Sequence, residues 1–210
     1  LASRPIRIIL ADEVDRFPAS AGSEGDPLSL ARKRTSTFHN SKVIAVSTPT
    51  IKGVSRIEDA FEKSDQREYY IPCRHCDHEQ TLEWANVKWQ DNDPDTAGYL
   101  CESCGVLWSD ADRRWSVRNG RWVAGQEFKG IAGFKISGLY SPWTPLADGV
   151  REFLSVKKNP EQLKVWVNTY LGSVFEDEGE TVDELNLMQR REEYKDVPEG
   201  VVMIVAGADV

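Results

Sequence analysis

Four cysteines, the only ones in the 210-residue chain, fall into two pairs with the spacing of metal ligands. Cys73 and Cys76 form one Cys-x-x-Cys pair, and Cys101 and Cys104 form the second pair after 24 intervening residues. Two such pairs can supply the four thiolates of a tetrahedral zinc site. Four unrelated reduced thiols or two disulfides are the alternatives, but zinc is favoured because the sequence shows no secretory feature.

The predicted zinc site is structural rather than catalytic, since four sulfur ligands leave no open position for water. His75 and His78 lie beside the first pair and could each replace a thiolate, but the four cysteines already complete the ligand set. Structural zinc can contribute on the order of 10 kcal/mol to folding. Such a contribution would explain how a segment rich in Cys, Trp and short turns, with few helix signals, can fold.

A pair of acidic residues forms the second candidate site, because Asp12 and Glu13 follow the apolar run that ends at Leu10. P-loop ATPases place a Mg²⁺-binding Asp and a catalytic Glu in this way, at the carboxyl end of a strand. Acidic residues are common at strand ends, so the pair alone leaves a structural role open. The next predicted strand ends in Ser47–Thr48–Pro49, whose hydroxyls suit a group that senses phosphate or couples hydrolysis to movement.

A third acidic residue, Asp209, follows the last apolar run, Val201–Val205. An acid at the end of a buried strand could be the first metal ligand of a two-metal nuclease. By itself this signal is weak.

The elements that must position these residues alternate between strand and helix up to about residue 67, as in parallel α/β layers. Strands are predicted over 6–12 and 42–47. A helix is predicted from Asp26–Pro27, and a shorter one from Ser55, which has Glu58 three residues later, through Phe61.

Later elements are a strand over 131–139 and three helices. The helices are predicted to begin at Thr144–Pro145, at Asn159–Pro160 and at Thr181. Near-continuous apolar runs such as Ile6–Leu10 are typical of strands that are covered on both faces.

Composition limits the function classes. A net charge of −8 and a pI near 5.0 argue against a protein that coats nucleic acid through its overall charge. The longest apolar stretch, Val201–Ala208, is far shorter than the ~20 residues of a membrane span. The sequence therefore predicts a soluble intracellular protein, and the apolar strands near both ends lead us to interpret the chain as the middle of a larger one.

Taken in order, these motifs resemble the large terminase subunit of tailed bacteriophages, in the lambda-type, gpA-like branch that carries a zinc-ribbon insertion. The resemblance covers essentially all 210 residues, and the order and spacing of the motifs are more specific than any single motif. The matching stretches are IILADEVDRFP, GDPLSLARKRTSTF, KVIAVSTPTIKGVSRIE, the block from YYIPCRHC to YLCESCG, YSPW, WVNTYLGSVFE and VVMIVAGADV.

The resemblance implies an α/β fold with four parts. Residues 1–67 would be the C-terminal part of a P-loop ATPase domain, and residues 68–125 an inserted four-cysteine zinc ribbon. Residues 126–196 would hold the ATPase return strand and a helical linker, and residues 197–210 the first strand of an RNase H-like nuclease domain.

The same resemblance implies roles for individual residues. Asp12 and Glu13 would be the Walker B pair, in which Asp12 binds the Mg²⁺ of ATP and Glu13 activates water. Ser47 and Thr48 would belong to the coupling motif that responds to the nucleotide. Asp209 would be the first nuclease acid and would bind Mg²⁺ or Mn²⁺.

The resemblance also implies that the full protein couples ATP hydrolysis to DNA translocation into the procapsid and cuts concatemeric DNA. Its partners would be double-stranded DNA, the small terminase subunit, the portal of the procapsid and further copies of itself, in the host cytoplasm and without a membrane. One departure matters: the 210 residues contain no glycine-rich loop ending in Gly-Lys-Ser or Gly-Lys-Thr. We therefore expect these residues alone to be inactive.

A zinc-ribbon module that binds nucleic acid or a protein without catalysis is the alternative. Its support is a stretch in which basic residues alternate with tryptophans, although an ordinary solvated face with buried aromatics is favoured. A P-loop encoded upstream of Leu1 would support the motor, and a start codon near Leu1 would support the module. The residues of this stretch are Arg113, Arg114, Trp115, Arg118, Arg121, Trp122, Lys129 and Lys135.

Overall fold

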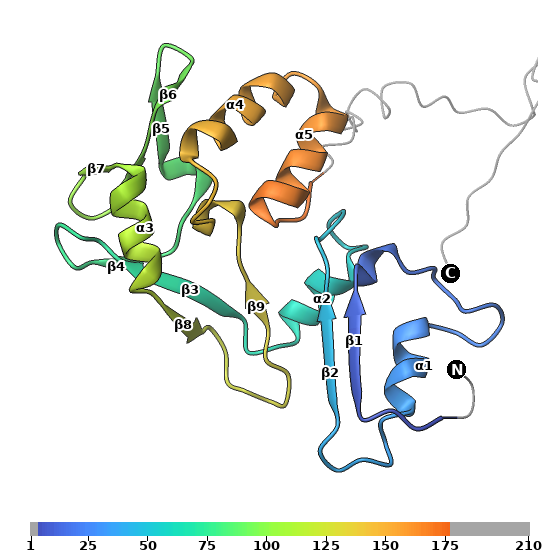
Figure 1. Cartoon of the computed structure of the whole chain (residues 1–210). Helices are drawn as coiled ribbons and strands as arrows, with labels where there is room; N and C mark the ends of the chain where they lie inside the picture. Colours follow the sequence, from blue (N-terminus) through green and yellow to red (C-terminus); the bar gives the residue numbers. More distant parts are fainter. Residues whose placement is uncertain (1–3, 177–210) are drawn as a thin grey trace, which may run out of the picture. The chain divides into compact units, whose positions relative to one another are not determined.

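The computed structural model describes residues 4–176, which belong to one compact unit of mixed α/β structure (Figure 1). Three predicted features lie outside the described residues: the helix from Thr181, the strand at Val201–Val205 and Asp209.

Two parallel strands lie side by side (Figure 1) and lead into the acidic pair and the hydroxyl residues. β1 (Ile8–Asp12) pairs with β2 (Lys42–Val46) in a register that places Leu10 opposite Ile44 and Asp12 opposite Val46. The prediction of parallel strands in this part of the chain is confirmed. Because both strands end at the same edge, the residues that follow them emerge close together.

Two short helices accompany these strands. α1 (Pro27–Lys33) begins after Asp26, whose carboxylate accepts the N–H of Ser29 at 2.8 Å. α2 (Arg56–Glu62) begins after Ser55, whose hydroxyl accepts the N–H of Glu58 at 3.2 Å. Both caps are those that the sequence predicted, although the reciprocal Glu58 bond of a full capping box does not form.

One face of the two-stranded sheet is uncovered by the residues that the structure describes. Alternate residues of paired strands share a face, and this face presents Ile8 and Leu10 from β1 with Ile44 and Val46 from β2. Their exposed fractions are 45%, 74%, 48% and 56% in that order. The prediction that these strands are covered on both faces therefore does not hold within residues 4–176.

The cysteine-rich segment is built from short antiparallel strands. β3 pairs with β4 and β8, while β5, β6 and β7 form a separate three-stranded sheet in that order. The bounds are β3 (Arg67–Pro72), β4 (Glu79–Gln80), β5 (Val87–Gln90), β6 (Asp93–Leu100), β7 (Leu107–Trp108) and β8 (Arg121–Ala124).

A helix within this segment, α3 (Asp110–Arg118), is absent from the sequence prediction. Ser109 and Asp112 form a reciprocal capping box at its start: the Ser109 hydroxyl accepts the Asp112 N–H, and the Asp112 carboxylate accepts the Ser109 N–H. The signal was therefore present, but with Asp in place of the usual Glu or Gln at the third helical position.

The strand predicted over 131–139 is reduced to two residues, β9 (Phe134–Lys135), which pair in parallel with Arg67 and Glu68 of β3. A 3-10 turn, η3 (Gly138–Tyr140), follows. The chain thus extends the sheet of the cysteine-rich segment, where a return strand of the ATPase sheet was expected. The predicted domain boundaries themselves stay predictions.

The two helices predicted after this point are confirmed. α4 (Leu146–Val156) follows Pro145, and α5 (Pro160–Trp166) continues as a π-helical turn, η4 (Val167–Leu171). The other short turns are η1 (Val14–Arg16) and η2 (Trp84–Asn86). No helix among residues 4–176 is long and apolar enough to cross a membrane.

Aromatic packing joins these helices to the cysteine-rich segment. Trp84 lies edge-on to Trp166 at 4.7 Å between ring centroids, and Trp166 stacks on Tyr170 at 5.3 Å. Tyr170 occupies a slot beside Gly149, where an added Cβ would come within 2.2 Å of the tyrosine oxygen. Burial raises the pKa of Tyr170 to about 12, so this phenol stays neutral at physiological pH.

Candidate metal centre and carboxylate site

The first cysteine pair sits on a tight backbone turn. The Cys73 N–H donates to the carbonyl of His78 at 2.8 Å, and the Asp77 N–H donates to the carbonyl of Cys73 at 2.9 Å. Asp77 adopts the left-handed conformation that this turn requires, with φ of 58°.

The second pair repeats this turn residue for residue. The Cys101 N–H donates to the carbonyl of Val106, and the Gly105 N–H donates to the carbonyl of Cys101, both at 3.0 Å. Gly105 takes the left-handed position with φ of 70°, where glycine carries no steric cost. Two equivalent turns therefore point their cysteines at a common centre.

All four sulfur atoms lie within 4.8 Å of one another. Cys73 Sγ is 3.9 Å from Cys104 Sγ, and Cys76 Sγ is 3.9 Å from Cys101 Sγ. A tetrahedral ion with metal–sulfur bonds of ~2.3 Å has sulfur–sulfur edges of about 3.8 Å, whereas a disulfide needs ~2.05 Å. The cluster thus fits a tetrahedral metal ion and contains no disulfide.

The thiols of the cluster differ in burial and in pKa. Cys73 and Cys101 are buried, while Cys76 and Cys104 are exposed. Against the effect of burial, backbone N–H groups of His75 and Cys76 lower the pKa of the Cys73 thiol to about 7. Burial raises the pKa of the Cys101 thiol to about 12, so this sulfur resists ionisation unless a positive charge is placed beside it. A bound divalent cation would supply that charge to all four sulfurs.

The two nearby histidines lie outside the four-sulfur cluster. His78 Nε2 is 2.8 Å from a carboxylate oxygen of Glu102, which joins the two turns from the outside. The Glu102 N–H in turn donates to the side-chain oxygen of the buried Gln80 at 3.1 Å.

Arg113, placed by the sequence in a basic surface stretch, is instead fully buried. All five of its N–H donors are engaged. Nε and Nη2 donate to Asp110 at 3.0 and 2.8 Å, Nη1 donates to the carbonyls of Leu139 and Ser141, and Nη2 also donates to the carbonyl of Thr144. Arg113 therefore fixes α3 to the chain that leads into α4.

A second buried charged residue, Asp65, joins the chain just before β3 to residues 125–133. Its side chain accepts one hydrogen bond from Nε of Arg67 at 2.8 Å and one from the N–H of Gly133 at 3.1 Å, and Nη2 of Arg67 also lies 2.8 Å from the carboxylate. Its carbonyl also accepts the N–H groups of Gly125 and Gln126. The hydrogen bond from Arg67 holds the pKa of Asp65 below its ordinary value of 3.8.

The acidic pair lies at the end of β1, in what we call the carboxylate loop, residues 12–16. Asp12 is exposed, and its carboxylate accepts the N–H of Glu13 at 3.0 Å. Glu13 adopts a left-handed backbone with φ of 53° and ψ of 46°. Its carboxylate is 3.0 Å from Nε of Arg16, and both side chains remain open to solvent.

The hydroxyl residues follow β2 in what we call the hydroxyl loop, residues 47–52. Ser47 Oγ accepts the N–H of Asp15 at 3.2 Å and donates to the carbonyl of Thr48 at 3.0 Å. The structure therefore joins the two loops that carry the residues predicted from the two strand ends.

Asp15 connects these loops and is missing from the sequence prediction. Its carboxylate accepts the hydroxyl of Thr50 at 3.0 Å and the N–H of Ile57, in the first turn of α2, at 2.8 Å. The sequence placed it in the matched stretch IILADEVDRFP. The only sequence signal for Asp15 was that it is an acidic residue two positions after Glu13, the candidate catalytic residue.

Comparison with known proteins identifies the family of the chain. The family profile described as "Phage terminase large subunit gpA, ATPase domain" matches residues 1–122, more than half of the 210. The chain belongs to the gpA family of phage terminase large subunits. A second profile of the same family, "Terminase large subunit gpA, endonuclease domain", matches residues 131–210.

Two curated relatives of this gpA-family chain are each named "Terminase, large subunit". The protein of Enterobacteria phage P21 is 34% identical over 98% of the chain, and that of Escherichia phage lambda is 30% identical over 94%. The chain spans only 36% and 35% of the length of these relatives. No solved structure matches the chain.

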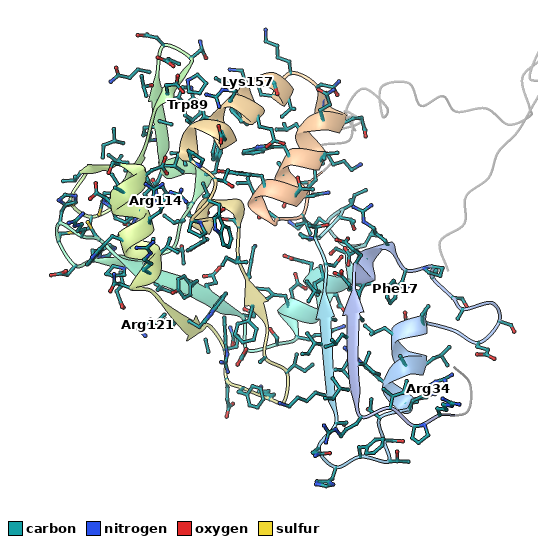
Figure 2. The ribbon with its side chains drawn as sticks, in the orientation of Figure 1. Phe17, Arg34, Trp89, Arg114, Arg121 and Lys157 are labelled. Carbon is teal, nitrogen blue, oxygen red and sulfur yellow. The ribbon has the colours of Figure 1, made fainter. Side chains whose placement is uncertain are left out.

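The basic and aromatic stretch gives little support to a separate binding module in this gpA-family chain. Arg121 of β8 pairs with Glu79 at 2.5 Å, and Arg113 is buried, whereas Arg118 is exposed (Arg114 and Arg121 are labelled in Figure 2). Trp115 and Trp122 are each 37% exposed. Several of these residues therefore serve internal contacts.

Proposed function

We propose that the chain is part of a terminase large subunit that couples ATP hydrolysis to the translocation of double-stranded DNA into a procapsid. The same subunit would cut concatemeric DNA with a metal-dependent endonuclease. The small terminase subunit, the portal and further copies of the subunit would be its partners in the host cytoplasm. Membership of the gpA family, with matches to both its ATPase and its endonuclease domains, supports this proposal.

One structural observation carries the ATPase half of the proposal. Asp12 and Glu13 share one edge of a parallel sheet with Ser47, and the hydrogen bond from Asp15 to Ser47 joins the two loops. Open α/β sheets bind their ligands at the carboxyl ends of the strands. Solvent-open carboxylates at that edge suit contact with a nucleotide rather than a role in the core.

In this proposal Asp12 would bind the Mg²⁺ of ATP, and Glu13 would orient water and accept its proton. Phosphoryl transfer depends mainly on positioning and on neutralising the charge of the γ-phosphate. The glycine-rich loop and lysine that neutralise this charge in a P-loop fold do not occur among the 210 residues. Ser47 and Thr48 would form the coupling motif that moves with the nucleotide state.

The four cysteines would bind one Zn²⁺ as a closed structural site. Zinc suits four thiolates in tetrahedral geometry, and a closed site has no position for a reacting water. The metal would therefore hold the two cysteine turns together and take no part in hydrolysis. Asp209 would be the first ligand for Mg²⁺ or Mn²⁺ in an RNase H-like nuclease.

ATP hydrolysis by the full-length subunit tests the proposal. Glu13→Gln should retain ATP binding and lower kcat by roughly 10²-fold or more, because an amide cannot accept the proton of water. Asp12→Ala should weaken Mg²⁺-dependent nucleotide binding instead. The matched control is Glu24→Gln, an exposed acid in the following loop. Parental turnover in both site variants would show that this pair is not the hydrolytic site.

A further inference from the structure

Thr50 makes two connections at once. Its hydroxyl donates to Asp15 in the carboxylate loop at 3.0 Å, and its backbone carbonyl accepts the N–H of Phe175 at 3.0 Å. A single residue of the hydroxyl loop therefore touches both the loop that carries Glu13 and a segment more than 120 positions away in the sequence.

The contact with the distant segment extends beyond one bond. The Lys52 N–H donates to the carbonyl of Phe175 at 3.3 Å, so that Ile51 and Phe175 form a parallel β-bridge. Beside this bridge Lys52 Nζ lies 2.5 Å from a carboxylate oxygen of Glu176. Backbone and side chains thus fasten residues 50–52 to residues 175–176.

The bridge joins the two domain matches of the family. Thr50 lies within residues 1–122, matched by the ATPase profile, and Phe175 lies within residues 131–210, matched by the endonuclease profile. Residues 173–176 follow Gly172, the residue after η4, which adopts a left-handed conformation with φ of 61°. A displacement of residues 50–52 would therefore act directly on residues 175 and 176.

The other end of this connection is set by the backbone around Glu13. Glu13 holds a left-handed conformation that is uncommon for a residue with a side chain. Two residues later Asp15 is fixed by Ser47, Thr50 and Ile57, and between them Val14 is buried. A change in the Glu13 backbone would therefore shift Asp15 and, through it, the hydroxyl loop.

We propose that the hydroxyl loop transmits the nucleotide state of the carboxylate loop to the endonuclease side of the chain. Asp15 and Thr50 are positioning residues on one side, and the bridge of Ile51 to Phe175 is the connection on the other. The inference rests on the proposed function, since it assumes that nucleotide binds beside Asp12 and Glu13. It adds a route by which that binding reaches the nuclease region.

Hydrogen exchange in the full-length subunit, with and without Mg²⁺-ADP, tests this route. The N–H groups of Lys52 and Phe175 should change their exchange rates roughly fivefold or more on nucleotide binding, in the range of ordinary allosteric coupling. Thr50→Val removes only the hydroxyl and should abolish the change at Phe175, whereas Thr50→Ser should restore it. Thr37→Val, at an exposed threonine, is the control.

Exchanging the charges of Lys52 and Glu176 gives an independent variant that leaves Thr50 intact. Lys52→Glu should reduce the nucleotide-dependent change at Phe175, and adding Glu176→Lys should restore it. An unaltered change in Thr50→Val and in Lys52→Glu would overturn the proposal, as would a parental subunit that hydrolyses ATP without any change at Phe175. A parental subunit that neither binds nor hydrolyses ATP would instead overturn the proposed function.

Discussion

The cysteine cluster and the carboxylate loop differ in how many of the groups that their chemistry would need are present in the chain. Two equivalent turns position the four sulfurs, and two of the four cysteines are buried. By contrast, Asp12 is exposed and lies at the end of a sheet with one uncovered apolar face. The four cysteines suffice for a tetrahedral ion, whereas the 210 residues contain no glycine-rich loop ending in Gly-Lys-Ser or Gly-Lys-Thr to accompany the carboxylates.

This difference is the one expected between a stabilising metal site and a site that hydrolyses a nucleotide. A closed metal site contributes to folding and gains from burial, since water would compete for its ligands. A site that hydrolyses a nucleotide must keep its carboxylates accessible until the substrate and its remaining contacts arrive. Variants of the closed site should therefore reduce stability, whereas variants of Glu13 should reduce turnover.

The largest effect should come from the metal site. Cys101→Ser in the 210-residue chain should lower bound zinc from one ion per chain to well below one. Residues of about 68–125 should unfold, because zinc binding is worth on the order of 10 kcal/mol. Elemental analysis and hydrogen exchange measure the two effects, and exchange in β1 should remain unchanged.

Ser103→Ala is the matched control for this substitution, since Ser103 is an exposed residue between two ligands. The control should retain its zinc and its exchange pattern. Normal folding of the parental chain after chelation would show that the cluster is not a metal site that supports the fold.

Replacing Arg113 should have the next largest effect. Arg113→Met leaves Asp110 and three carbonyls without their partner, and a broken buried ion pair costs about 3–5 kcal/mol in the free energy of unfolding. Arg113→Lys should lie in between, because an ammonium offers three donors where five are used. Denaturant unfolding measures this, with the exposed Arg118→Ala as control. Equal stability of parent and Arg113→Met would refute the assignment of Arg113 as the link between α3 and α4.

A smaller effect is expected from Asp65 and should depend on pH. The hydrogen bond from Arg67 lowers the pKa of Asp65 below its ordinary value of 3.8, so the ionised carboxylate is the form that stabilises the fold. Its contribution should be complete well above pH 3.8 and be lost as the pH falls through the depressed pKa. Asp65→Asn should therefore destabilise the chain at pH 7 and converge with the parent in acid. Stability curves that stay parallel would contradict this, and Glu127→Gln serves as an exposed control.

Much of the local structure could be predicted from the sequence, because its signals are local. Asp26 and Ser55 cap the helices that their spacing predicted, and the cysteine pairs gather as their spacing predicted. The carboxyl-end placement of Asp12 and Ser47 followed from strand ends alone.

The features that were missed depend on contacts between distant segments. Arg113 looks like a surface residue in a basic stretch, and only the carbonyls of Leu139, Ser141 and Thr144 explain its burial. Asp15 likewise gains its role from partners in another loop and helix. Of the strand predicted over 131–139 only β9 forms. It lies where Arg67 and Glu68 of β3 have a free edge to pair with.

ATP hydrolysis by the 210-residue chain itself tests the contrast between the two sites most directly. The measurement uses reduced, folded chain carrying one zinc per molecule, beside the full-length subunit at equal concentration. We predict no turnover above background by the chain, because Asp12 and Glu13 lack the phosphate-binding lysine and loop, and clear turnover by the full-length subunit. Turnover by the chain that Glu13→Gln abolishes would contradict this account, since the carboxylate loop would then form a complete site.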